Sequence, residues 1–375
     1  MKKNSWLTLA AAAGATALVL AGCSSDDGDA DAESTAGATS DTQTESSETA
    51  AAAGGDGSRA CVILPDAVSS PRWENGDRPA LEEAITAAGF EADIQNAQGD
   101  TAKYATIADQ MLTQGCGVMM LVDHQGAAVS VTENAQSQGI PVIAYDRPIE
   151  GADYYVSFDN VKVGELEGQM IVDGLNDNGV DPAEATVVYI GGDPADGNAA
   201  MFYEGANNVM TEAGITPAAE PPGKWDGEYS ATAFEQALTD LGGEVDAVWA
   251  ANDTNAAGVI TILDKNGLTV PVSGQDASVA GLQNVLLGKQ YGTVYKPYQV
   301  EATAGAELAI QLLNGETPAV DMTLEDGTPF IAVEPISVGA SDVQQVIDDG
   351  NASYDEICAG DVAAACDEAG LTAGS

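Results

Sequence analysis

The chain of 375 residues is long enough for two domains of ordinary size in addition to a terminal segment. It carries 59 acidic and 12 basic side chains, so its formal net charge is −47. A chain this acidic repels nucleic acid, and we expect no nucleic-acid partner. It has a single histidine, and its cysteines lack metal-ligand spacing, so we expect no metal site.

Residues 1–22 have the pattern of a secretory signal peptide, with two lysines, an apolar run and small residues before a cleavage point. The segment Leu20-Ala-Gly-Cys23 resembles a bacterial lipobox, which implies cleavage before Cys23 and acylation of its thiol. The alternative is an ordinary signal peptide followed by a chance cysteine. We expect an exported protein, anchored by lipid to the outer face of the cell membrane.

Residues 23–59 are expected to form a lipidated cysteine and a disordered acidic tether. Residues 24–59 are rich in Ser, Thr, Ala, Gly and acids, a composition that cannot bury a core. The folded part should begin near Ala60. The acidic surface fits either a saline habitat or a lineage bias.

Four cysteines remain after Cys23, and export permits disulfides. Cys61 and Cys116 each begin a predicted strand, and in a sheet of order 2-1-3 those strands are neighbours. Cys358 and Cys366 lie close together near the C-terminus. We predict these two pairs.

Apolar runs and helical periodicities alternate along the chain with short loops, which predicts parallel sheets with right-handed crossovers. The rhythm restarts after Asn160, so two doubly wound α/β domains fit better than one large sheet. The expected strands are 61–65, 91–95, 118–122, 141–144, 154–158, 186–190, 216–219, 245–250, 270–273, 292–295 and 331–338. The expected helices are 79–88, 101–114, 127–138, 161–175, 198–213, 231–241, 255–265, 279–287 and 298–313.

The strand 141–144 ends at Tyr145-Asp146-Arg147, which places a carboxylate beside a guanidinium. In open α/β sheets, ligands bind beyond the carboxyl ends of the strands. Residues 60–375 contain only nine bases, and Arg72, Arg147 and Lys296 all follow predicted strands. Each could instead be a solvated loop charge or an ion-pair partner, but together they favour a binding site.

Other strand ends carry carboxylates and amides, in the segments 191–198, 251–253 and 274–276. Such groups, together with cations, can bond a vicinal diol, because each hydroxyl both donates and accepts. Trp73 and Trp225 lie in predicted loops, where a flat indole suits the apolar face of a pyranose, although it can also simply pack a loop.

Six segments resemble, in order, the motifs of bacterial xylose-binding proteins, which are type I periplasmic sugar-binding proteins of ABC importers. The resemblance spans roughly residues 60–347. Its segments are Arg72-Trp73, Tyr145-Asp146-Arg147, Val156-Ser-Phe-Asp-Asn-Val-Lys-Val-Gly-Glu165, Gly191-Gly192 to Asn198, Ser273-Gly-Gln-Asp276 and Thr293-Val-Tyr-Lys-Pro297.

The resemblance implies two Rossmann-like domains joined by a three-strand hinge, with one monosaccharide enclosed between them. The segment after Trp73 is one residue out of step with the family, so Asp77 is left out, and the loop around Trp225 differs in length. The residues expected to contact the ligand are Arg72, Trp73, Asp146, Arg147, Asp196, Asn198, Trp225, Asn252, Asp276 and Lys296.

The expected subdomains are 60–157 with 297–329, and 158–296 with 330–357, followed by a tail at 358–375. The expected function is the capture of a monosaccharide for delivery to an ABC permease, and D-xylose is the first candidate for the ligand. The protein is expected to be a monomer without a cofactor. Glucose, galactose or another aldose is the alternative ligand, with a sensor as a possible second recipient.

Three other functions are disfavoured. Gly191-Gly192 precedes a helix, but no G-x-G-x-x-G follows, which argues against a dinucleotide site. Asp146 and Asp276 could form the pair of a glycoside hydrolase, but neighbouring cations favour their charged forms, which are poor proton donors. A DNA-binding regulator is excluded by the exported start and by the lack of a basic module.

His124 is expected on the rim of the cleft, with a ligand role as an alternative.

Overall fold

The computed structural model describes residues 58–67, 72–320 and 322–374. The expected signal peptide, the lipidated Cys23 and the tether as far as residue 57 lie outside this part of the chain. Within it, no helix is both long and apolar enough to cross a membrane.

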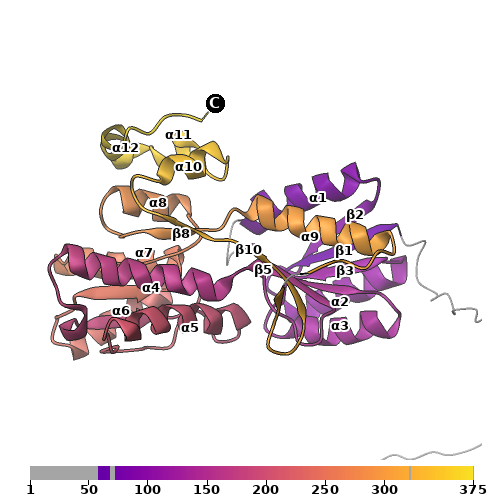
Figure 1. Cartoon of the computed structure of the whole chain (residues 1–375), viewed down its shortest axis with the longest axis horizontal. Helices are drawn as coiled ribbons and strands as arrows, with labels where there is room; N and C mark the ends of the chain where they lie inside the picture. The colour runs from indigo at the N-terminus through magenta and orange to yellow at the C-terminus, as the bar shows by residue number, and fades with distance from the viewer. Residues whose placement is uncertain (1–57, 68–71, 321, 375) are drawn as a thin grey trace, which may run out of the picture. The chain divides into compact units, whose positions relative to one another are not determined.

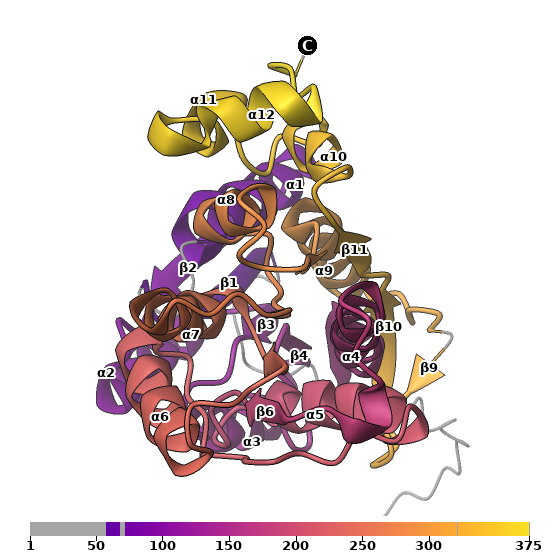
Figure 2. The same cartoon turned by 90° about the vertical axis from the view of Figure 1, so that its left-hand side faces the viewer.

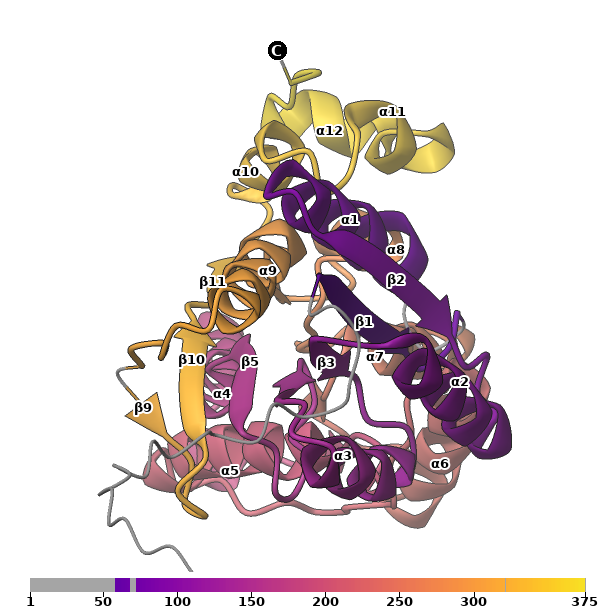
Figure 3. The same cartoon turned by 90° about the vertical axis from the view of Figure 1, so that its right-hand side faces the viewer.

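The first lobe is built on a seven-stranded sheet of order β2-β1-β3-β4-β5-β10-β9. All its pairings are parallel except that of β9 with β10. Helices α1 and α9 pack on one face, and α2 and α3 on the other (Figure 3). The strands are β1 Arg59–Leu64, β2 Glu91–Asn96, β3 Val118–Leu121, β4 Val142–Tyr145, β5 Tyr154–Phe158, β9 Met322–Thr323 and β10 Pro329–Val333. The helices are α1 Arg78–Ala87, α2 Thr101–Gln114, α3 Ala127–Ser137 and α9 Tyr298–Leu313, and a π-helical turn, η1, covers Trp73–Asp77.

The second lobe has parallel strands β6 and β7 and an antiparallel pair, β8 and β11. Single bridges at Ala219, Val272 and Gln275 connect these strands into one layer. Helices α4 and α5 cover one face, and α6 and α7 the other (Figure 2). The elements are β6 Val187–Ile190, β7 Ala247–Ala250, β8 Thr293–Tyr295, β11 Ile336–Val338, α4 Asn160–Asp177, η2 Pro182–Glu184, α5 Gly197–Glu212, α6 Gly227–Asp240, α7 Asp253–Asn266 and α8 Val279–Leu286.

The chain crosses between the lobes three times, after β5, after β8 and after β10 (Figure 1). The two doubly wound α/β lobes that the sequence predicted are therefore confirmed. Each crossing lies at the end of a strand, so the ends of these strands face the junction of the lobes.

The C-terminal part of the chain corrects two expected boundaries. The predicted strand 331–338 is two strands, and β10 pairs with β5 of the first sheet, so residues 330–333 belong to the first lobe and not to the second subdomain as expected. The expected tail at 358–375 contains helices that bury Cys366 and Leu371 against α8 and β8 (Figure 1). The tail contains η3 Gly360–Val362 and α12 Ala363–Ala369, and α10 Val343–Asp348 and α11 Tyr354–Ile357 precede it in the chain. The predicted strands 216–219 and 270–273 are reduced to single bridges.

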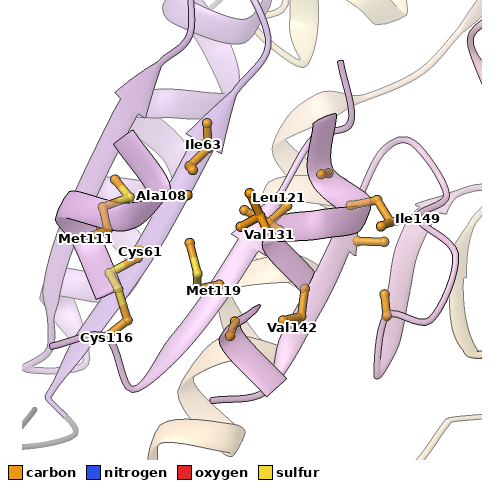
Figure 4. Close-up of a cluster of buried hydrophobic side chains, with 14 of the residues drawn as sticks. Cys61, Ile63, Ala108, Met111, Cys116, Met119, Leu121, Val131, Val142 and Ile149 are labelled. Carbon is orange, nitrogen blue, oxygen red and sulfur yellow. A yellow bond between two sulfur atoms is a disulfide. The ribbon is translucent and has the colours of Figure 1, made fainter. Parts of the chain in front are cut away.

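Both predicted disulfides are present. Cys61 of β1 is joined to Cys116, which precedes β3, and Cys358 is joined to Cys366. The first bond is buried against the apolar layer beneath α2 (Figure 4). Because β1 lies between β2 and β3, the predicted 2-1-3 order is confirmed as the reason that these two cysteines meet.

Helices α4 and α5 approach each other closely through glycines. A Cβ added at Gly164 would lie 2.0 Å from the carbonyl oxygen of Phe202, and one at Gly205 would lie 1.9 Å from that of Val161. Any larger residue would push the helices apart. The close packing brings the N-terminal ends of the two helices together at the junction of the lobes.

Candidate ligand pocket between the lobes

All ten residues that the sequence predicted as ligand contacts line one pocket, with a volume of about 50 Å³. Phe202 and Gln275 line it as well. Residues from the first lobe, the second lobe and the crossing after β8 all contribute. The sequence therefore placed the members of one pocket correctly, and their role as ligand contacts remains a prediction.

The turn at Asp146, between β4 and β5 of the first lobe, is hydrogen-bonded to the second lobe. Asp146 has a φ of 63°, a left-handed conformation that a non-glycine residue adopts at some cost. Its main-chain carbonyl accepts hydrogen bonds from Tyr155 Oη at 2.9 Å, Ser157 Oγ at 2.8 Å and Asn198 Nδ2 at 2.8 Å. Asn198 belongs to α5, and its Oδ1 accepts from Asn160 Nδ2 of α4 at 3.1 Å. This network holds the turn and leaves the Asp146 carboxylate facing the pocket.

Arg72 is surrounded by three carboxylates. Its guanidinium contacts Asp77 at 2.9 Å, Asp146 at 3.1 Å and Glu301 at 2.5 Å. Asp77 also accepts a hydrogen bond from Tyr145 Oη. Asp77 and Glu301 are fully buried and do not line the pocket, so they hold Arg72 from behind while Asp146 meets it inside.

Burial and charge act in opposite directions at this cluster. Burial tends to lower the pKa of Arg72, but Asp77, Glu301 and Asp146 outweigh it, so the pKa lies well above its usual value. Burial raises the pKa of Glu301 well above its usual value, and Arg72 only partly opposes this shift. Arg72 therefore stays charged, and Glu301 holds a proton more tightly than an exposed glutamate does.

Arg147 reaches across to the second lobe. Its Nε lies 3.0 Å from Asp196 Oδ2, at an angle that makes the contact an ion pair rather than a hydrogen bond, and its Nη1 donates to the Asp123 carbonyl at 3.0 Å. Asp196 is the N-cap of α5: one oxygen accepts from Asn198 N, and the other accepts from Trp225 Nε1 at 3.1 Å. The cap thus uses one carboxylate oxygen, and the other contacts Trp225 and Arg147 in the pocket wall.

Aromatic rings form three parts of the wall. Trp73 is buried, and the guanidinium carbons of Arg72 and Arg147 lie 4.6 and 5.7 Å from its ring centre. Phe202 and Trp225 meet edge to face with centroids 6.2 Å apart. A Cβ at Gly192 would lie 2.0 Å from the indole of Trp225, so a glycine is required here to make room for the ring. Packing against Trp225 therefore explains this glycine without a dinucleotide site.

The second lobe contributes Asn252, Asp276 and Lys296. Asn252 is the N-cap of α7 through Oδ1, and its Nδ2 lies 3.4 Å from Asp276 Oδ2. Lys296 Nζ lies 2.8 Å from Asp276 Oδ1 and 5.5 Å from the ring centre of Phe202. Burial tends to lower the pKa of Lys296, but Asp276 and Asp146 outweigh it and the pKa is raised. The ammonium is therefore charged at neutral pH.

A second, outer pocket of about 300 Å³ adjoins the first, and Arg147, Asp196 and Trp225 line both. The outer pocket includes His124, as expected for a residue on the rim, and His124 Nε2 has no hydrogen-bond partner among the described residues. No cluster of described residues has the ligands to hold a metal ion.

Sequence reasoning missed four residues of this site. Phe202 lies one helical turn after Asn198, so the spacing of four residues could have revealed it. Gln275 lies between two residues of a recognised motif. Glu301 is an acid on the apolar face of α9, and such a residue needs a buried partner. Asp77 lies in the segment that is one residue out of step with the family, and this shift hides its role.

The pocket combines carboxylates and amides with three cations and flat rings. Such groups can bond several hydroxyls of one small polyol and cover its apolar faces. Such an arrangement suits the binding of one small polar molecule.

Comparisons with known proteins agree with this geometry. A family model described as a periplasmic binding protein domain matches residues 61–317. The D-xylose-binding periplasmic protein of Escherichia coli is 34% identical over 76% of this chain and 88% of its own length. A multiple sugar-binding periplasmic protein of Azospirillum brasilense is 32% identical over 73% of this chain and 84% of its own.

A solved structure with the same fold is an ABC transporter solute-binding protein from Clostridium phytofermentans with bound β-D-glucose. Its TM-score is 0.72, with 27% sequence identity, and the match covers 80% of this chain and 99% of that one.

We predict that the protein is more stable at pH 5 than at pH 8. Burial raises the pKa of Asp253 to about 7 and also raises the pKa values of Glu167, Asp196 and Glu301. Between the unfolded pKa near 4 and these raised values the folded state binds more protons, so the free energy of unfolding falls as pH rises.

Urea unfolding at pH 5, 6, 7 and 8 measures this dependence. In Asp253→Asn the decrease from pH 5 to pH 8 should be smaller, because this group no longer titrates. A free energy of unfolding that is constant or rises with pH would contradict the prediction.

Proposed function

Because this chain belongs to the periplasmic binding protein domain family, whose members are solute-binding proteins and not enzymes, we propose that it captures one monosaccharide, D-xylose, and delivers it to an ABC importer. The ten pocket residues named above are proposed as the ligand contacts. The observation that carries the proposal is the pocket itself, in which carboxylates, amides, cations and rings from both lobes converge.

Binding is proposed to close the lobes. Asp146 and Arg147 belong to the first lobe, whereas Asn252 and Asp276 belong to the second, so a sugar bonded to both sets binds the closed form better than an open one. A ligand shifts a conformational equilibrium only by its difference in affinity for the two forms. The three crossings are the hinge in this proposal. Closure presents a different surface to the permease, which can then recognise the loaded protein.

Sequence similarity supports D-xylose over a hexose. The relatives from Escherichia coli and Haemophilus influenzae, each 34% identical to this chain, are D-xylose-binding proteins. The structural relative that holds β-D-glucose makes glucose the second candidate.

Ligand identity is tested by thermal unfolding of the mature protein with D-xylose, D-glucose and D-galactose. D-xylose should give the largest rise in Tm, because a ligand at about 100 times its Kd adds about 2.7 kcal/mol to the free energy of unfolding. A larger rise with glucose would reassign the ligand. No rise with any monosaccharide would contradict the proposed function.

Arg147→Ala should weaken the binding of D-xylose by roughly 30-fold to several thousand-fold. Truncating a buried polar partner of this kind costs about 2–5 kcal/mol, at about 1.4 kcal/mol per tenfold. Arg147→Lys should lose at least about tenfold, because an ammonium cannot present the planar fork of a guanidinium.

Calorimetry of both variants gives the Kd values. The matched control is Lys265→Ala, which removes an exposed base of α7 that pairs with Glu235 outside the pocket, and it should bind within about twofold of wild type. If Arg147→Ala also binds within about threefold, the pocket is not the sugar site.

We also propose that Cys23 carries the lipid that holds this protein, as a monomer, at the outer face of the cell membrane. Cys23→Ala should leave D-xylose affinity unchanged but move the protein from the membrane fraction to the soluble one, because acyl chains supply the membrane affinity. Cell fractionation and mass spectrometry of the N-terminal peptide measure both. Unchanged membrane retention without lipid on residue 23 would refute the anchor.

A further inference from the structure

Asp253 is a buried carboxylate behind the pocket, which it does not line. Its Oδ1 accepts hydrogen bonds from Gln290 Nε2 at 2.8 Å and Thr293 Oγ1 at 2.9 Å. Its Oδ2 accepts from Ser278 N at 2.8 Å and Ser278 Oγ at 3.0 Å. Four donors therefore converge on one carboxylate whose neighbour in the chain, Asn252, faces the pocket.

These donors surround the turn that carries Asp276. Asp276 and Ala277 have φ angles of 97° and 47°, two consecutive left-handed residues without a glycine. Such a conformation persists only where the surroundings hold it in place. Ser278, the next residue, donates directly to Asp253. The Ala277 N–H donates to Thr293 Oγ1 at 3.1 Å, and that hydroxyl in turn donates a hydrogen bond to Asp253 Oδ1. Both residues that follow Asp276 are thus tied to the same carboxylate.

The space around this carboxylate is fitted to it. A Cβ at Gly274 would lie 2.5 Å from Asp253 Oδ1, and one at Gly281 would lie 2.1 Å from Oδ2. Two glycines, one on each side of the turn, therefore leave room for the carboxylate. The Asp253 N–H also donates to the Gln275 carbonyl at 3.0 Å, which fixes the start of α7 against the turn.

The turn determines the direction of a group that faces the pocket. Asp276 Oδ1 receives Lys296 Nζ at 2.8 Å, and the Asp276 N–H donates to the Val294 carbonyl at 2.9 Å. A rotation at Asp276 or Ala277 would move the carboxylate away from Lys296 and from the pocket. The main-chain bond to Val294 fixes one side of the turn, and Asp253 fixes the other.

We propose that Asp253 is a positioning residue for ligand binding: it holds the strained Asp276–Ala277 turn so that the Asp276 carboxylate faces the ligand. This inference rests on the proposed function of the pocket and adds a residue outside its lining. Asparagine has the same shape as aspartate, but its amide group would face two of the four donors instead of accepting from them.

Asp253→Asn should therefore raise the Kd for D-xylose by about 5- to 150-fold, the equivalent of about 1–3 kcal/mol for donors left without an acceptor. Thr293→Val removes the hydroxyl that links the Ala277 N–H to Asp253, and it should raise the Kd by about tenfold, at the middle of that range. Thr293→Ser keeps the hydroxyl and should bind within about threefold of wild type. Asp264→Asn, an exposed substitution on the same helix, is the control and should bind within about twofold.

Calorimetry is performed on mature protein whose fold is checked by circular dichroism and thermal unfolding. Wild-type binding is measured first, since its absence would refute the proposed function and not this inference. If wild type binds and folded Asp253→Asn has a lower Tm but a Kd within about threefold, Asp253 is only structural and the inference is overturned. If Asp253→Asn does not fold, the Thr293 pair decides: equal affinities for Thr293→Val and Thr293→Ser overturn the inference, and a loss confined to valine supports it.

Discussion

The main-chain carbonyl of Asp146 accepts three side-chain hydrogen bonds, and the arrangement of the pocket depends on it. Two of the donors come from β5 of the first lobe, and the third, Asn198, comes from α5 of the second. A left-handed residue at this position turns the chain sharply at the end of β4, so that the adjacent carboxylate and guanidinium of Asp146 and Arg147 face the junction. Helices α4 and α5 deliver Asn160 and Asn198 to this turn because glycines let them pack closely.

The pocket concentrates the rare cations of a strongly acidic chain. Arg72, Arg147 and Lys296 each have at least one carboxylate partner within 3.1 Å. Removing charges from water is costly, and such pairs often contribute little net stability. In this pocket the ion pairs instead fix positions: each one holds a donor and an acceptor at a defined place on the pocket wall. A polar ligand that reproduces these contacts is accepted, and one that leaves them unpaired is rejected.

A second layer of acids lies behind the pocket. Asp77 and Glu301 hold Arg72, and Asp253 holds the turn of Asp276, and all three are buried and hydrogen-bonded. Each of these acids fixes a group that faces the pocket without lining it. Raised pKa values of Glu301 and Asp253 show that burial acts against charge at these positions. These acids hold the lining groups in place, but Glu301 and Asp253 must each lose a buried proton as pH rises. The free energy of unfolding therefore falls as pH rises.

Local pattern in the sequence determined the alternation of strands and helices, the two-lobe organisation and the pairing of the cysteines. The carboxyl ends of parallel strands in one sheet meet at one edge, so the polar residues after strands 118–122 and 141–144 gather at the edge of the first sheet, and those after 186–190 and 245–250 gather at the edge of the second. The motif resemblance then selected ten of the residues that line the pocket, including Trp225, whose loop belongs to no strand or helix. These features depend on contacts that repeat along the chain or on short motifs, and both are visible in one dimension.

Only the tertiary structure decided that β10 pairs with β5, that the C-terminal helices pack on α8, and that Arg72 meets Glu301, 229 residues further along the chain. Strand pairing and buried ion pairs join segments whose separation carries no periodicity, so no local pattern reports them. The left-handed turns at Asp146 and Asp276 are of the same kind. Neither is a glycine, and each adopts its conformation because distant donors compensate for the strain.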